Sequence, residues 1–191
     1  IVGYFDLSMN LDPEMEGVIE DVFEYLTTVI NQRTNTTGCE DEIASSRVRI
    51  LITEATLSGS PVAAATPMYY GPGRSFCDEV VINRVDLRMN GGISDQGVDG
   101  SIEIDATPGF DWYTGSGSPG VNELDLFSVV LHEALHLFGF ASLIDEEGEA
   151  NSGSYSVWDQ YLRTTTLYVD GGPSLNIDPV LESNCEINCW E

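Results

Sequence analysis

Two histidines and a glutamate between them are the residues best suited to do chemistry in this chain. His132 and His136 are the only histidines among 191 residues, and they are four positions apart. On a helix, this spacing places both imidazoles on one face, where they can bind one metal ion. Glu133 lies about 100° further around the helix than His132. The H-E-x-x-H spacing therefore predicts a zinc site with His132 and His136 as ligands and Glu133 as general base.

The residues around the histidines favour a metal site over two ordinary histidines in an amphipathic helix. The stretch from Leu131 to Phe138 is otherwise apolar apart from Glu133. Unpaired imidazoles are costly to bury in such surroundings, and a bound cation would remove that cost. We therefore expect both imidazoles to bind zinc.

The sequence around the motif resembles that of a known class of enzymes. Residues 131–140, LHEALHLFGF, are similar to the H-E-x-x-H-x-x-G-F segment of metzincin-type zinc peptidases, above all leishmanolysin-like enzymes and secreted bacterial zincins. The likeness spans about residues 100–163 and includes the segments 112–115, 125–131 and 158–162. It implies a zincin-like peptidase in which a helix-backed sheet lies above a cleft. It also implies that Gly139 turns the chain toward a third metal ligand.

Two departures from the metzincin pattern make this chain metzincin-like at most. The position six residues after the second histidine, which supplies the third ligand in short-spacer metzincins, is Ser142 here. A neutral hydroxyl is a poor zinc ligand. Metzincins also carry a methionine turn beneath the metal, whereas the four methionines of this chain all precede the motif.

The third ligand is expected to be a carboxylate or, less favoured, a tyrosine, because the chain has no third histidine. The carboxylate candidates are Asp145, Glu146, Glu147, Glu149, Asp159 and Asp170. An exposed acidic run such as 145–149 is typically solvated, or binds Ca²⁺. Asp159 lies among Trp158, Tyr161 and Leu162, where a carboxylate is costly to bury without a cation. We therefore favour Asp159 as the third ligand over a helix-cap or surface role.

These residues predict a secreted zinc metalloendopeptidase that acts on polypeptide substrates. The substrate would lie along an exposed sheet edge as an added strand. One alternative is a non-catalytic, metal-stabilised adhesin or structural module, in which four protein ligands would close the site. Another is a zinc hydrolase that acts on non-peptide amides.

Hydrophobic periodicity in the first half of the chain predicts the elements that position this motif. Residues 1–8 alternate loosely, as in a short strand. Asp12 and Pro13 then begin a long helix whose apolar positions recur at helical spacing as far as Ile30. Alternation predicts a strand over 47–57, and strand signals return at 79–88 and 101–105. The Gly-, Pro- and Ser-rich residues between these strands, including 58–77, are expected to form connections.

The second half is expected to contain the active-site helix and a small irregular region. Asn122 is predicted to cap that helix and Gly139 to end it, and a short helix is expected at 156–163. This order of elements predicts an α+β fold, a twisted sheet backed by a long helix. We expect a single catalytic domain over 1–191, with an N-terminal subdomain at 1–140 and a small C-terminal subdomain at 141–191.

The charge balance argues against two classes of partner. The chain has 32 acidic and 7 basic residues, and its formal net charge is −25. Such a surface repels nucleic acid and anionic membranes, so we expect neither as a partner. We also expect a monomer. The acidic residues either form a solubilising surface or include Ca²⁺ ligands. Residues 95–106 share part of the EF-hand pattern, but Gly97 and Ala106 occupy ligand positions, which favours a turn into a strand.

The cysteines indicate an oxidising compartment and therefore secretion. Four cysteines suit two disulfides, for which we favour Cys39–Cys77 and Cys185–Cys189 among the three possible connectivities. No run approaches the roughly 20 apolar residues that a membrane-spanning helix needs. The chain begins with Ile1, and we expect it to be a mature fragment that has lost a leader.

Overall fold

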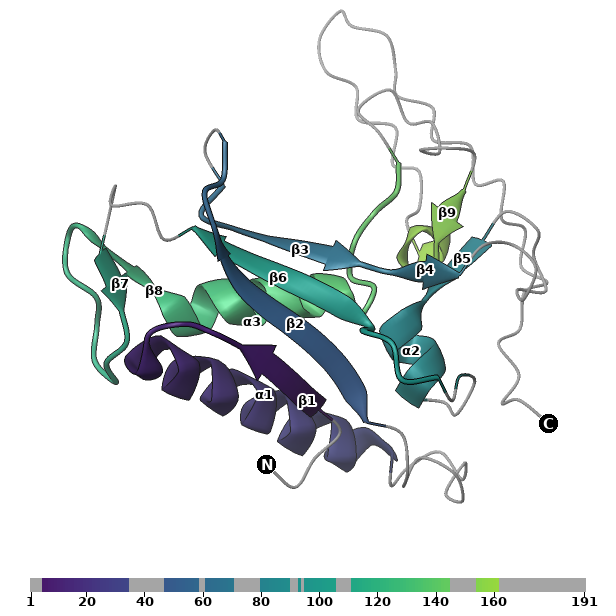
Figure 1. Ribbon diagram of the computed structural model, residues 1–191. Helices are drawn as coiled ribbons and strands as arrows, with labels where there is room; N and C mark the ends of the chain where they lie inside the picture. Colours follow the sequence, from purple (N-terminus) through teal and green to yellow (C-terminus); the bar gives the residue numbers. More distant parts are fainter. Residues whose placement is uncertain are drawn as a thin grey trace, which may run out of the picture.

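A four-stranded sheet forms the centre of the computed structural model, which describes residues 5–34, 47–58, 61–70, 80–89, 93, 95–105, 111–144 and 154–161. The strand order is β1 (Phe5–Met9), β2 (Val48–Ala55), β6 (Gly100–Asp105) and β3 (Ala63–Pro67). β1, β2 and β6 are parallel, whereas β3 runs antiparallel to β6 at one edge. Both long helices cover the same face of this sheet (Figure 1). The predicted α+β class is therefore confirmed.

The long helix α1 (Pro13–Thr34) begins where the sequence predicts. Asp12 Oδ1 accepts a hydrogen bond from the backbone N–H of Glu14 at 2.9 Å, and Pro13 occupies the first helical position, where a missing N–H costs nothing. Ile19, Val22 and Phe23 are fully buried on its inner face. The helix connects the parallel strands β1 and β2, which a tight turn could not join.

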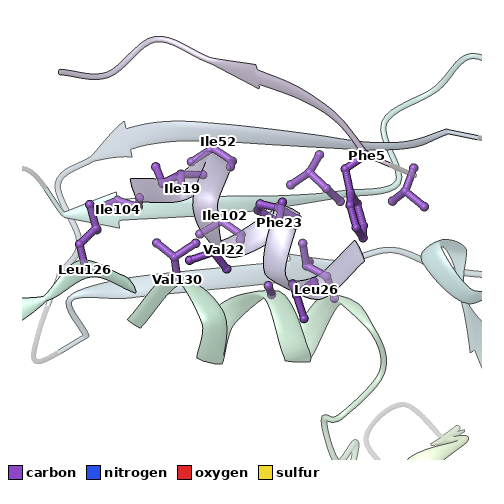
Figure 2. Close-up of a cluster of buried hydrophobic side chains, with 14 of the residues drawn as sticks. Phe5, Ile19, Val22, Phe23, Leu26, Ile52, Ile102, Ile104, Leu126 and Val130 are labelled. Atoms are coloured by element: carbon purple, nitrogen blue, oxygen red, sulfur yellow. The ribbon is translucent and has the colours of Figure 1, made fainter. Parts of the chain in front are cut away.

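The helix α3 (Leu126–Leu137) carries the histidine motif and is anchored by its apolar face. Leu126, Val130, Ala134 and Leu137 are buried at helical spacing, and they belong to the same core cluster as the inner side chains of α1, β2 and β6. Figure 2 shows Leu126 and Val130 facing Ile102, Ile104 and Val22. Burial of each large apolar side chain contributes about 1.5–3 kcal/mol to stability. This packing leaves the opposite face of α3 for the histidines.

The start of α3 differs from the prediction that Asn122 caps the helix. Residues Glu123–Asp125 form strand β8, which pairs in parallel with β7 (Asp111–Tyr113), and Asp125 is the N-cap residue. The backbone groups of 123–125 are engaged by a neighbouring strand, so the helix cannot begin before Leu126. β7 lies within residues 106–121, which are rich in Gly, Pro and Ser and carry no strand pattern.

A second, three-stranded sheet also departs from the prediction. It has the order β4 (Tyr69–Tyr70), β5 (Val80–Asn83) and β9 (Tyr155–Ser156). The expected strand at 79–88 ends early because Asn83 Oδ1 accepts a hydrogen bond from Asp86 N–H at 2.7 Å and caps helix α2 (Arg84–Met89). The expected helix at 156–163 is, in the part described, β9 followed by the 3-10 helix η3 (Trp158–Tyr161).

Several predictions concern residues that lie outside the described ranges. These are the cysteine pairing, the acidic run 145–149 and Asp170. The described part of the predicted C-terminal subdomain is hydrogen-bonded to the N-terminal one, because β9 pairs with β5. Among the helices that the structure describes, none combines the length and apolar character needed to cross a membrane.

Two arginines of α2 form ion pairs with the acidic segment before β6. Asp99 is fully buried and accepts hydrogen bonds from Arg84 Nε at 2.8 Å and from Arg88 Nε at 2.7 Å. Asp95 binds both arginines as well. The N–H of Gly97 and the two guanidinium groups lower the pKa of Asp95 to about 2. These carboxylates are therefore paired with arginines, which agrees with the interpretation of this segment as a turn into a strand.

Loss of the Arg88 side chain should strongly destabilise the fold. Arg88 is 2% exposed, so Arg88→Ala leaves the buried charge of Asp99 short of a partner, and we expect a loss of about 3–5 kcal/mol in the free energy of unfolding. Arg49→Ala is the control, because its ion pair with Asp6 is long, at 3.8 Å, and partly exposed; about 1 kcal/mol or less should be lost. Urea denaturation measures the free energy of unfolding of both variants, and an equal loss of stability in the two would contradict this account.

Candidate metal and catalytic site

The imidazoles of His132 and His136 converge on one point beside α3. Their Nε2 atoms are 3.1 Å apart, and the rings are nearly perpendicular, at 86°. Two imidazole nitrogens bound to one tetrahedral zinc at about 2.0–2.1 Å lie about 3.3 Å apart. The pair therefore offers two nitrogen donors at a separation close to the one that such an ion needs.

The turn that ends α3 holds the ring of His136. Gly139 has a φ of +88°, its N–H donates to His136 O at 3.0 Å, and Phe140 N–H donates to Leu135 O at 3.1 Å. This is a Schellman motif, and glycine suits its left-handed position. The turn brings the carbonyl oxygen of Phe140 to 2.9 Å from Nδ1 of His136.

This carbonyl determines which nitrogen of His136 can bind a metal. A carbonyl oxygen only accepts hydrogen bonds, so Nδ1 must carry the proton. The lone pair of the neutral ring is then on Nε2, the atom that faces His132. The predicted role of Gly139 as the helix stop is confirmed, and the stop also orients a predicted ligand.

Glu133 lies between α3 and the edge strand of the main sheet. Its side chain is buried, and Oε2 accepts a hydrogen bond from the backbone N–H of Ala65 in β3 at 2.7 Å. Since β3 ends the sheet, this N–H points away from β6 and toward the helix. The carboxylate is thus held beside the sheet edge, one residue from His132.

The exposure of the histidines corrects one sequence argument. His132 is exposed and His136 is half-buried, so relief of a burial cost does not explain the pair. The apolar residues of this stretch that are buried lie on the other face of α3. An exposed pair is open to water and to a substrate, which a catalytic metal site needs.

The structure does not bring Asp159 to the histidines. Its Oδ2 accepts hydrogen bonds from Ser156 N–H at 2.7 Å, Ser156 Oγ–H at 2.9 Å and Leu143 N–H at 3.0 Å. Among the described residues, no group of three His, Cys, Asp or Glu side chains is placed to hold a metal ion. Asp159 is buried, as expected, and backbone and hydroxyl donors surround Oδ2.

A cavity of about 390 Å³ adjoins the C-terminal turn of α3, and the sequence did not predict it. Phe138, Gly139 and Phe140 line one side, and the other walls come from β4, β5, α2 and the region of β9 and η3. Tyr69 of β4 lies in the stretch expected to be a connection. The two adjacent tyrosines at 69 and 70, within a Gly- and Pro-rich stretch, were the available signal for this strand.

Comparisons with protein-family models, curated proteins and solved structures found no match to this chain. The functional assignment therefore depends on the residues and their geometry.

Gly139→Ala should destabilise the protein, whereas Gly17→Ala should not. A left-handed φ costs a non-glycine residue about 1–2 kcal/mol. A Cβ at Gly139 would also lie 2.5 Å from Asn83 Nδ2. Gly17, inside α1, has no atom within 4 Å of its Cβ position, so alanine there should stabilise the protein by about 0.5–1 kcal/mol. Urea denaturation measures the change in the free energy of unfolding for both variants. An unchanged stability of Gly139→Ala would contradict the role of the turn.

Proposed function

We propose that this chain is a secreted zinc-dependent endopeptidase with its active site on α3. The observation that carries this proposal is the 3.1 Å separation of the two Nε2 atoms, in a motif that also supplies a carboxylate at the sheet edge. The arrangement of three parallel strands, one antiparallel edge strand and a histidine-bearing helix below them supports a zincin-like fold.

His132 and His136 would hold the zinc ion, and an acidic side chain would complete its protein ligands. The candidates outside the described ranges are Asp145, Glu146, Glu147, Glu149 and Asp170. The hydrogen bonds of Asp159 to Ser156 and Leu143 make it a weaker candidate than the sequence suggested.

Glu133 would perform the proton transfers of peptide hydrolysis. When bound, zinc supplies a Lewis acid that polarises the scissile carbonyl and lowers the pKa of a coordinated water. Glu133 takes the proton of the attacking water and returns it to the leaving amine. The N–H of Ala65 holds Oε2, which fixes the carboxylate and leaves Oε1 to handle the proton.

The edge of β3 is the natural place for an extended substrate. An added strand would hydrogen-bond to outward backbone groups of β3 other than the N–H of Ala65, which is bound to Glu133. Pro67 lacks an N–H, so strand pairing is weaker at that end of β3. A peptide in this position would pass beside both Glu133 and the histidine pair.

The exposure of His132 favours a catalytic site over a structural one. A structural zinc ion is enclosed by four protein ligands, whereas a catalytic ion keeps a position for water and substrate. The alternative is a non-catalytic module with a closed, structural zinc site, and measurements of zinc content and peptidase activity distinguish the two.

Glu133→Gln should keep zinc and lose peptidase activity. Glutamine preserves the shape and an acceptor for Ala65 N–H but cannot take a proton, so hydrolysis of casein should fall by about 10²–10⁴-fold. Zinc content is measured in parallel by elemental analysis. Glu103→Gln, an exposed residue of β6, is the matched control and should retain full activity. Full activity in Glu133→Gln would refute the assigned mechanism, and a wild-type protein that binds zinc but cuts nothing would favour the structural module.

Alanine variants should identify the third ligand. Wild-type protein should bind about one zinc ion per chain, and His136→Ala should bind almost none. We expect one of the variants at Asp145, Glu146, Glu147, Glu149 and Asp170 to lose zinc in the same way, because a carboxylate is needed to complete the site. Asp159→Ala is measured alongside, and loss of zinc in that variant alone would restore Asp159 as the ligand.

A further inference from the structure

The cavity that adjoins the C-terminal turn of α3 has aromatic walls. Phe138 and Phe140 come from the turn that ends α3, and Trp158 comes from η3. The rings of Phe140 and Trp158 are 5.3 Å apart, and both remain about 40% exposed, so they are available to a ligand. Aromatic faces attract apolar groups and also cations, through the negative charge of the ring face.

Two buried oxygen atoms next to this cavity have no hydrogen-bond partner in the described part of the chain. They are the hydroxyl of Tyr69, which lines the cavity, and Oδ1 of Asp159. Ser156 also lines the cavity and donates its hydroxyl to Asp159 Oδ2 at 2.9 Å, so Asp159 lies directly behind the wall. Burial raises the pKa of Tyr69, and the negative charge of Asp159 raises it further. The two groups are therefore close enough to interact, yet no hydrogen bond joins them.

The charge of Asp159 distinguishes between possible occupants. Its side chain is 5% exposed, and the ion pairs among the described residues involve Asp6, Asp95 and Asp99 instead. A purely apolar occupant would leave both oxygens without a donor in a drier environment, which is unfavourable. A guanidinium group carries a positive charge and five N–H donors, and it stacks on aromatic rings.

We propose that this cavity is a specificity pocket that binds a cationic side chain, best of all arginine, of the peptide substrate. The exposed faces of Phe140 and Trp158 contact the side chain, and its guanidinium lies toward Tyr69 and balances the negative charge of Asp159 behind the cavity wall. This inference rests on the proposed function in one respect, that the occupant is part of a peptide. The pocket adjoins the turn that holds His136, so a side chain bound there belongs to a residue close to the cleaved bond.

Small probes without a peptide bond test the pocket independently of hydrolysis. The full chain is titrated with n-butylguanidinium, with its neutral isostere n-butylurea and with toluene, and tryptophan fluorescence reports occupancy next to Trp158. Binding of n-butylguanidinium should be at least about tenfold tighter than that of n-butylurea, because the urea lacks the charge. Equal binding, tighter binding of toluene, or no response to n-butylguanidinium would overturn the proposal.

Two variants test whether binding of n-butylguanidinium depends on Asp159 and on the hydroxyl of Tyr69. Asp159→Asn removes the charge and should weaken n-butylguanidinium binding about tenfold or more, and Tyr69→Phe should weaken it about threefold or more. Asp111→Asn is the matched control, because it removes an exposed carboxylate on β7 and should change nothing. Zinc content and circular dichroism are recorded for each variant. If Asp159→Asn does not fold, Tyr69→Phe decides alone, and unchanged binding in that variant overturns the proposal.

Peptide cleavage separates a failure of the pocket from a failure of the proposed function. Wild-type protein should cut a mixed peptide library with arginine or lysine enriched at one position next to the cleaved bond. Cleavage without that enrichment, together with absent probe binding, would keep the peptidase and reject the pocket. Probe binding without cleavage of any peptide would keep the cation site and reject the peptidase.

Discussion

The hydrogen bond between His136 Nδ1 and the carbonyl of Phe140 connects the end of α3 to the chemistry of the site. It exists because Gly139 adopts a left-handed conformation and turns the chain back over the last helical turn. The same turn places Phe138 and Phe140 in the wall of the cavity. The turn at Gly139 thus fixes the proton of His136 on Nδ1 and also shapes the adjoining cavity.

The main sheet supports this site in two ways, through the packing of α3 and through its edge strand β3. The apolar face of α3 packs against β6 and α1, which fixes the rotation of the helix about its axis and sends the histidines outward. Because β3 lies at the sheet edge, its backbone has an outward N–H at Ala65 that can bind Glu133. An interior strand could not offer this group, since both of its edges would be paired. The placement of the Glu133 carboxylate, the proposed general base, therefore depends on the position of β3 in the sheet.

The acidic character of the chain has different consequences in different places. Asp95 and Asp99 are balanced by Arg84 and Arg88, so they hold α2 to the start of β6. Asp159 is satisfied on one oxygen and unpaired on the other. The same residue type thus pairs with arginine in one place and keeps an oxygen without a partner among the described residues in another.

Elements with local signals can be predicted from the residues alone. Asp12 and Pro13 begin α1, Gly139 ends α3, and the four-residue spacing of the histidines brings their Nε2 atoms together within one helical turn. The pairing of β3, β4, β7 and β8, the partner of Glu133 and the surroundings of Asp159 depend instead on how distant segments pack together. Those features join residues far apart in the chain, such as Ala65 with Glu133, and short strands in Gly- and Pro-rich stretches are stabilised by partners that no local pattern identifies.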